Sequence, residues 1–134
     1  MITLHFDGSC ILGKRARGGW VLREFPGAMA ITGNTGNVSC DYPTCNVAEY
    51  AGLAGGLEDA LRRFGPSELH VYGDSQMVIK QMSGVYKVKH KQGQPLKPYV
   101  PYFYSALHAA KQHKSIRWSW IPREQNTEAD GAAA

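Results

Sequence analysis

Two short apolar runs in this chain are each followed by an aspartate, and this arrangement constrains the fold more than any other feature. Residues 2–6 precede Asp7, and residues 69–73 precede Asp74. A long helical pattern separates the two runs, so a helical crossover would place them side by side and parallel in one sheet. Both aspartates would then leave the sheet at the same edge, where open α/β sheets bind their ligands.

The rest of the periodicity predicts an α/β fold. Alternation and turn signals predict three further strands, at residues 18–22, 29–32 and 116–121. Apolar residues at helical spacing predict three helices, at residues 44–64, 75–84 and 99–113. We expect a five-stranded mixed sheet flanked by helices, with three antiparallel strands followed by two parallel strands that helical crossovers connect. Three glycines should let the longest helix pack closely on this sheet: Gly52, Gly55 and Gly56.

Two further carboxylates accompany the strand-end aspartates. Glu49 lies in the first turns of the longest helix, and Asp130 lies in a short acidic segment after the last strand. Carboxylates that converge from strands and helices form the hard oxygen ligand set that Mg²⁺ prefers. A pair of such ions can activate water and stabilise the leaving oxygen of a phosphodiester. The sequence therefore predicts a metal site at this edge.

Each acid also has a purely structural interpretation. Glu49 lies three residues after Asn46 and could complete a capping box, while Asp74 could cap the helix that follows it. The other two acids could lie in a turn or face solvent. Four acids that each mark the end or start of a different element favour the metal site over four independent structural acids.

Composition predicts one domain, residues 1–134, of the ordinary globular kind, with 43% hydrophobic and 19% charged residues. No apolar run approaches the ~20 residues that span a bilayer, and no signal-peptide pattern opens the chain. We therefore expect a cytoplasmic monomer without membrane contact. In that compartment the three cysteines are expected to be reduced thiols, with a Cys40–Cys45 bridge as the alternative: Cys10, Cys40 and Cys45.

The positive charge of the chain is segregated along the sequence. The formal net charge is +4, but residues 75–123 hold nine Lys and Arg and no acid, which leaves six cations and all eleven acids elsewhere. A basic region beside an acidic centre is typical of a protein that grips a polyanion on one side and cuts it on the other. A solvated basic surface is the alternative.

Five segments of the chain resemble ribonuclease H of type 1, in the family's order and at the edges of predicted elements. They are FDGSC at 6–10, GGW at 18–20, TCNVAEY at 44–50, GDSQ at 73–76 and NTEAD at 126–130. The resemblance covers essentially the whole chain. It implies an endonuclease that hydrolyses the RNA strand of RNA–DNA hybrids with two Mg²⁺ or Mn²⁺ ions and leaves 5′-phosphate and 3′-hydroxyl ends. It also implies that the four acids hold these ions: Asp7, Glu49, Asp74 and Asp130.

The resemblance also implies contacts with the nucleic acid. Asn46 and Gln76 stand where the family contacts 2′-hydroxyl groups in the minor groove, and Thr44 where it contacts a phosphate of the DNA strand. Arg123 is a further candidate for a phosphate contact. The basic segment after residue 84 supplies candidates for gripping the DNA strand: Tyr86, Lys87, Lys89, His90 and Lys91.

Four features depart from the commoner family pattern, and the first two indicate a subgroup. The longer basic protrusion and the mobile histidine before the last acid are missing, and Arg123-Glu124 occupies the histidine's region. Cys45 stands where an asparagine is usual, which removes one expected minor-groove contact. Only four residues follow Asp130 here, so we expect a final helix that is nearly absent, buries little, and leaves Asp130 mobile and its metal site weak.

Two other functions are compatible with the same residues. One is a module that binds hybrid or duplex RNA and cleaves weakly or not at all. The other is a nuclease of the same fold that acts on DNA. Asn46 and Gln76 beside the acids favour recognition of RNA, and the presence of all four acids favours cleavage.

Overall fold

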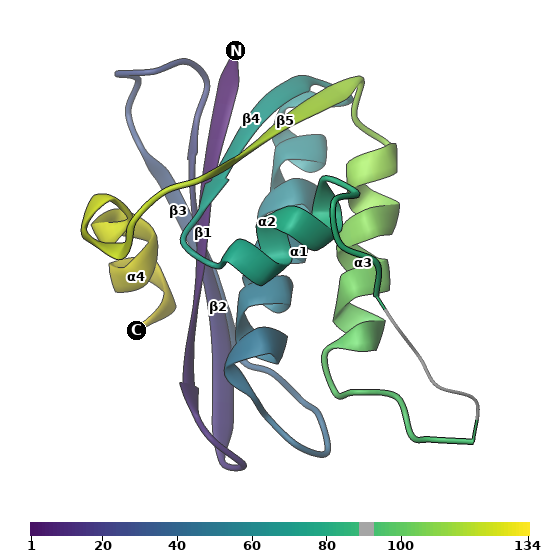
Figure 1. The fold of residues 1–134 in the computed structure, drawn as a ribbon. Coiled ribbons are helices and arrows are strands. Elements are labelled where there is room, and N and C mark those ends of the chain that lie inside the picture. The colour runs from purple at the N-terminus through teal and green to yellow at the C-terminus, as the bar shows by residue number, and fades with distance from the viewer. Residues whose placement is uncertain (89–92) are drawn as a thin grey trace.

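The computed structural model describes residues 1–88 and 93–134, which form one mixed sheet with helices on both faces (Figure 1). The five strands lie in the order β3-β2-β1-β4-β5. They are β1 (Ile2–Ile11), β2 (Arg15–Arg23), β3 (Ile31–Asn37), β4 (Glu68–Gly73) and β5 (Ser115–Trp120). The β1–β2 and β2–β3 pairs are antiparallel, and the β1–β4 and β4–β5 pairs are parallel. The predicted topology is confirmed.

The helices cover the two faces of the sheet unequally. The helices are α1 (Cys45–Phe64), α2 (Gln76–Met82), α3 (Val100–Lys111) and α4 (Thr127–Ala133), and a 3₁₀ turn occupies Arg123–Gln125. The first three lie on one side of the sheet and α4 lies on the other (Figure 1). Adjacent glycines of β2 show this division, because Gly18 contacts Gly52 of α1 whereas Gly19 contacts Ala133 of α4.

The first strand is longer than its apolar run. We predicted a strand over residues 2–6 that ends before Asp7, but β1 continues to Ile11. Its parallel pairing with β4 does end where expected, at Phe6 opposite Gly73, while its antiparallel pairing with β2 continues to Ile11 opposite Arg15. The hairpin partner thus extends the strand through polar residues, and Asp7 lies at the point where β4 stops.

Glycines bring α1 directly onto the sheet, as predicted. A Cβ atom on Gly52 would lie 2.6 Å from the Asp7 carbonyl oxygen, and one on Gly55 would lie 2.5 Å from the Trp20 ring. On the sheet side, a Cβ atom on Gly8 would lie 2.4 Å from the Glu49 nitrogen. No larger residue fits at these positions without moving backbone or the buried Trp20 ring, so this glycine seam fixes the distance between α1 and the sheet.

The segment after Asn126 is better anchored than predicted. It forms α4, which buries Ala129 and Ala133 completely against the sheet. Gly19 allows this, because a Cβ atom there would lie 2.3 Å from the Ala133 nitrogen. Arg23 of β2 forms an ion pair with Glu128 at 2.8 Å. The expectation that this segment could bury little was wrong, because small residues meet a glycine and the backbones pack directly.

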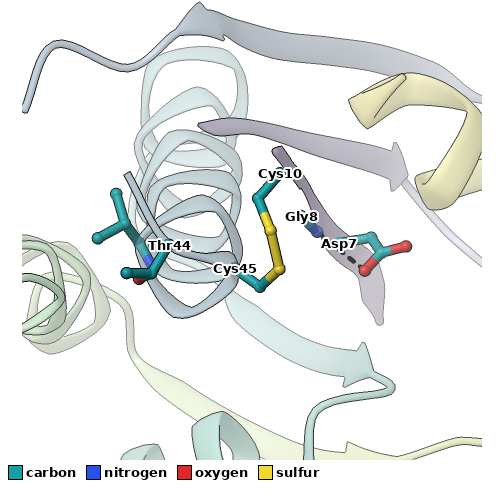
Figure 2. Close-up of a disulfide and its surroundings, with 6 residues drawn as sticks. Asp7, Gly8, Cys10, Thr44 and Cys45 are labelled. Carbon is teal, nitrogen blue, oxygen red and sulfur yellow. Dashed lines mark hydrogen bonds between the residues drawn. A yellow bond between two sulfur atoms is a disulfide. The ribbon is translucent and has the colours of Figure 1, made fainter. Parts of the chain in front are cut away.

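The expectation of three reduced cysteines is also contradicted. A disulfide joins Cys10 of β1 to Cys45 at the start of α1, with a Cα–Cα distance of 5.1 Å, and Cys40 is free (Figure 2). The pairing depends on the extension of β1, because only that extension carries Cys10 alongside the first turn of α1. A separation of 35 residues in the sequence does not reveal this proximity.

Among the described residues, none of the helices is long and apolar enough to cross a membrane. The cytoplasmic location and the monomeric state stay predictions.

Candidate metal centre and nucleic-acid site

Three of the four predicted acids meet at the junction of β1, α1 and β4. Asp7, Glu49 and Asp74 each present a carboxylate oxygen within 4.8 Å of the others. Asp7 is buried at 7% exposure, and the other two are partly buried. The parallel β1–β4 pairing delivers the two aspartates, and the glycine seam delivers Glu49 from the helix above. Residues far apart in the sequence therefore form one compact group of oxygen donors.

Asp7 has an environment that opposes ionisation. Burial raises the pKa of its carboxyl group from the ordinary 3.8 to about 7, and the negative charges of Asp74, Asp130 and Glu49 add to this rise. A hydrogen bond from the Gly8 N–H to Asp7 Oδ1, of 2.8 Å, acts in the opposite direction (Figure 2). Asp7 is thus the acid whose pKa reflects all three of the other predicted ligands.

Glu49 shares this behaviour. Burial raises its pKa from 4.5 to about 7, helped by the charge of Asp74 and opposed by a hydrogen bond from Ser75 and by the positive charge of Arg123. The capping-box interpretation is wrong, because Thr44 is the N-cap of α1 and accepts a hydrogen bond from the Val47 N–H at 3.2 Å. Glu49 therefore plays no part in capping α1, and its carboxylate lies with those of Asp7 and Asp74.

Asp74 is held by two residues to which we assigned no role from sequence. Asn126 is buried at 1% exposure, and its Nδ2 donates to Asp74 Oδ2 at 3.2 Å and to the Phe6 carbonyl oxygen at 2.9 Å. Trp120 Nε1 donates to the Asp74 carbonyl oxygen at 3.0 Å. The segment NTEAD contained Asn126 as part of the resemblance, but its partners lie 52 and 120 residues away and leave no local signal.

Asp130 lies apart from the other three acids. It belongs to the first turn of α4, its backbone N–H donates to the Asn126 carbonyl oxygen at 3.1 Å, and its side chain is exposed. It does not belong to the compact group. Its charge still raises the pKa of Asp7, so it lies close enough to act on the site electrostatically.

The predicted contacts with nucleic acid lie on elements that carry or adjoin the acids, at partly or fully exposed positions. Thr44 and Asn46 flank the start of α1, and Gln76 is the first residue of α2, directly after Asp74 and Ser75. Arg123 opens the 3₁₀ turn, and its charge reaches Glu49. These residues lie at the start of α1, at the start of α2 and in the 3₁₀ turn, and their contacts with nucleic acid stay a prediction.

The basic segment is only partly described. Tyr86 and Lys87 are exposed, and Lys80 donates to the Tyr86 hydroxyl at 3.3 Å while lying over its ring. Lys89, His90 and Lys91 lie outside the described residues. The described part of this segment contains no helix or strand between Ser83 and Lys87, in agreement with the predicted loop.

The donor set fits a divalent cation. Three carboxylates within 4.8 Å of one another form a hard oxygen site. Asp7 and Glu49 would retain protons up to about pH 7 unless positive charge compensates them. A divalent ion supplies that charge, so the electrostatics and the ligand chemistry agree.

Comparison with known proteins defines the class of the domain. The chain belongs to the reverse transcriptase-like family, with a match over residues 5–134. The fold is that of an RNase H-like domain, and solved structures of RNase H1 enzymes are similar over almost the whole chain. The resemblance to type 1 ribonuclease H is thus confirmed, while the subgroup stays a prediction.

Particular relatives extend this comparison. The chain is 47% identical over 90 residues to the bifunctional protein Rv2228c of Mycobacterium tuberculosis, a match that covers 67% of this chain and 23% of the relative. An uncharacterized protein of Mycobacterium bovis, Mb2253c, is equally similar. The match therefore covers less than a quarter of the length of these curated relatives.

Solved structures align over nearly the full chain. The N-terminal RNase H domain of Rv2228c has a TM-score of 0.79 and 32% identity, and covers 98% of this chain and 94% of that one. RNase H1 from Halobacterium salinarum has a TM-score of 0.78 and 28% identity, covering 98% and 92%. LC11-RNase H1, solved with an RNA/DNA hybrid, has a TM-score of 0.76 and 27% identity, covering 98% and 93%.

Proposed function

We propose that this chain is a metal-dependent endoribonuclease that hydrolyses the RNA strand of RNA–DNA hybrids and leaves 5′-phosphate and 3′-hydroxyl ends. One observation carries the proposal: Asp7, Glu49 and Asp74 present oxygens within 4.8 Å of one another on an RNase H-like fold. The hybrid in the LC11-RNase H1 structure supports the choice of substrate.

The acids have separable roles in this proposal. Asp7 would contribute to both metal positions, because it is the acid whose pKa responds to Glu49, Asp74 and Asp130 together. Glu49 and Asp74 would complete one position, and Asp130 would belong to the other. Two Mg²⁺ or Mn²⁺ ions bound there supply activation of water and stabilisation of the leaving 3′-oxygen. Asn126 and Trp120 keep Asp74 oriented by their hydrogen bonds.

The partly or fully exposed residues around the acids would recognise the hybrid. Asn46 and Gln76 carry amides that can both donate to and accept from a 2′-hydroxyl, which distinguishes RNA from DNA. Thr44 would contact a DNA-strand phosphate, and Arg123 would contact a phosphate close to Glu49. The lysines after residue 84, with Tyr86, would add an electrostatic grip on the DNA strand.

The test is cleavage of an end-labelled RNA–DNA hybrid with Mg²⁺ or Mn²⁺, beside duplex RNA and duplex DNA of the same sequence. We expect cutting of the hybrid's RNA strand only, and products whose 5′ ends accept a label only after phosphatase treatment. Asp7→Asn and Asp74→Asn should each lower turnover by roughly 10³-fold or more, because each removes a ligand from the group.

A matched control keeps this test specific. Glu58→Gln removes an exposed carboxylate from the same helix that carries Glu49 and should leave turnover unchanged. Near-full cleavage by Asp7→Asn would contradict the assignment. Tight hybrid binding without cleavage under either ion would instead identify a binding module, and preferential cutting of duplex DNA would identify a DNA nuclease of the same fold.

A further inference from the structure

The disulfide joins the two elements that carry Asp7 and Glu49 (Figure 2). Cys10 lies three residues after Asp7 on β1, and Cys45 is the first residue of α1, one helical turn before Glu49. Thr44 and Asn46, two proposed contacts with the hybrid, flank Cys45 directly. The bond therefore lies at the edge of the site where nucleic acid is expected to bind.

The disulfide is accessible to small molecules. Cys45 is exposed and Cys10 is partly buried, so a thiol in solution can reach the Cys45 sulfur. A thiol therefore attacks first at the exposed Cys45 sulfur. The partial positive charge at the N-terminus of α1 stabilises a thiolate at Cys45, which favours the second step, in which Cys45 leaves from the mixed disulfide. Exposed disulfides are the readily exchanged ones, whereas structural disulfides resist reduction.

The first turn of α1 depends on this bond more than the rest of the helix does. From Ala48 onward the glycine seam holds the helix on the sheet, with Gly8 against Ala48 and Gly52 against the Asp7 backbone. Ahead of the helix, the Gly13 N–H donates to the Pro43 carbonyl oxygen at 2.9 Å. The Thr44 hydroxyl is used inside the helix, on the Val47 N–H. Between these points the disulfide is the covalent tie to β1.

We propose that Cys10–Cys45 is a thiol-exchange site that controls binding of the hybrid by holding the start of α1 against β1. The inference rests on the proposed function for its substrate. With the disulfide formed, Thr44 and Asn46 keep fixed positions relative to the acids. With the disulfide reduced, the first turn of α1 gains freedom, and ordering it costs binding free energy.

The chemistry is thiol–disulfide exchange with a low-molecular-weight thiol. One thiolate attacks the Cys45 sulfur, the bond to Cys10 breaks, and Cys10 leaves as a thiolate. A second thiol displaces the reagent from Cys45, which yields the reagent's own disulfide. Two electrons pass from the reagent to the protein, and both cysteines become protonated. Oxidation is the reverse reaction with the reagent's disulfide.

The experiment compares oxidised and reduced protein in a Cys40→Ser background, so that the free cysteine cannot contribute. Thiol titration should give no thiols before dithiothreitol and two after it. With Asp7→Asn added to prevent cleavage, the Kd for the hybrid should rise roughly five-fold or more on reduction. In the cleaving protein the same change should raise KM and leave kcat within about two-fold.

A double variant, Cys10→Ser/Cys45→Ser, should bind as the reduced protein does and should not respond to dithiothreitol. Hydrogen exchange provides a readout independent of the substrate, because reduction should speed exchange in the first turn of α1 and leave α3 unchanged.

The outcomes separate the two proposals. If neither redox state binds or cuts the hybrid, the proposed function fails, and hydrogen exchange still decides whether the disulfide orders α1. Equal Kd and equal exchange in both states would overturn the inference. So would two titratable thiols after treatment with oxidised glutathione, or tighter binding by the reduced protein.

Discussion

The acid group and the candidate contacts for nucleic acid differ in how firmly the fold holds their side chains. Asp7, Glu49 and Asp74 are buried or partly buried, and strand pairing, a glycine seam and a buried amide fix them. Asn46 and Gln76 lie at helix starts with partly or fully exposed side chains, and Tyr86 and Lys87 are exposed on a loop. The proposed catalytic geometry is thus set by the core, while the proposed binding contacts are left to side chains that can adapt.

This difference has a functional consequence. Ligands that must meet within a few ångströms tolerate little displacement, because chemistry depends steeply on geometry. Contacts with a polyanion are spread over many charges, and each contributes modestly and depends on salt. The disulfide lies at the boundary between the two regions, because Cys10 belongs to the strand of Asp7 and Cys45 to the turn of Thr44 and Asn46.

After the acids themselves, the largest effect is expected from a single substitution in the buried region. Asn126→Ala removes the hydrogen bond to Asp74 and should lower turnover by roughly 10–100-fold, as loss of a partner to a metal ligand does. Calorimetry should show that the affinity for Mg²⁺ falls by a similar factor. The hybrid Kd of the metal-free protein should change little, because the contacts for nucleic acid remain.

Glu128→Gln provides the matched control for that variant. It breaks the ion pair between α4 and Arg23 of β2 without touching Asp74. If Asn126 acted only by anchoring α4, both variants would lose turnover alike, and the role assigned to its amide would be refuted.

A smaller effect is expected from the exposed region. Changing Lys87, Lys89 and Lys91 to Ala together should weaken hybrid binding roughly ten-fold and flatten its salt dependence by up to about one unit of log–log slope per lysine. Binding is measured in an Asp7→Asn background over a range of salt concentrations. Lys111→Ala/Lys114→Ala, at the far end of β4 and β5, should leave the slope nearly unchanged. If the salt dependence of binding had the same slope in all of these proteins, the basic segment would not contribute to binding of the hybrid.

The smallest effect concerns the charge of the acid group without metal. Because the pKa values of Asp7 and Glu49 are raised to about 7 in the folded state, the folded protein holds protons that the unfolded chain releases near pH 4. This contribution to stability is complete below about pH 4 and is lost as pH rises through 7. Asp7→Asn mimics the neutral form of the carboxyl group. Its free energy of unfolding, relative to that of wild type, should increase by on the order of 1 kcal/mol when the pH is raised from 5 to 8.

Urea unfolding with a chelator at both pH values measures this difference. Glu58→Gln should show no such pH-dependent gain, since its carboxylate is exposed. Adding Mg²⁺ should stabilise wild type at pH 8 more than Asp7→Asn. If the free energies of unfolding of wild type and Asp7→Asn differed by the same amount at pH 5 and pH 8, the acids would not repel one another in the folded protein.

Much of the fold followed from local patterns. Alternation and helical spacing predicted the order of elements and the sheet topology, because burial of one face imposes a period on each segment. Boundaries set by a partner strand were missed: β3 runs over Ile31–Asn37 rather than residues 29–32, and β1 extends past its apolar residues. Pairing with a neighbour, and not the local residues, decides where such strands end.

The sequence by itself determined which acids are candidates for the chemistry, since they follow or begin elements that the periodicity of the chain predicts. Only the tertiary structure decided how those residues are supported. Asn126 donates a hydrogen bond to Asp74, Cys10 forms a disulfide with Cys45, and Gly19 packs against Ala133. These contacts join segments that are remote in sequence. Such contacts depend on the path of the backbone in space, and no local period records that path.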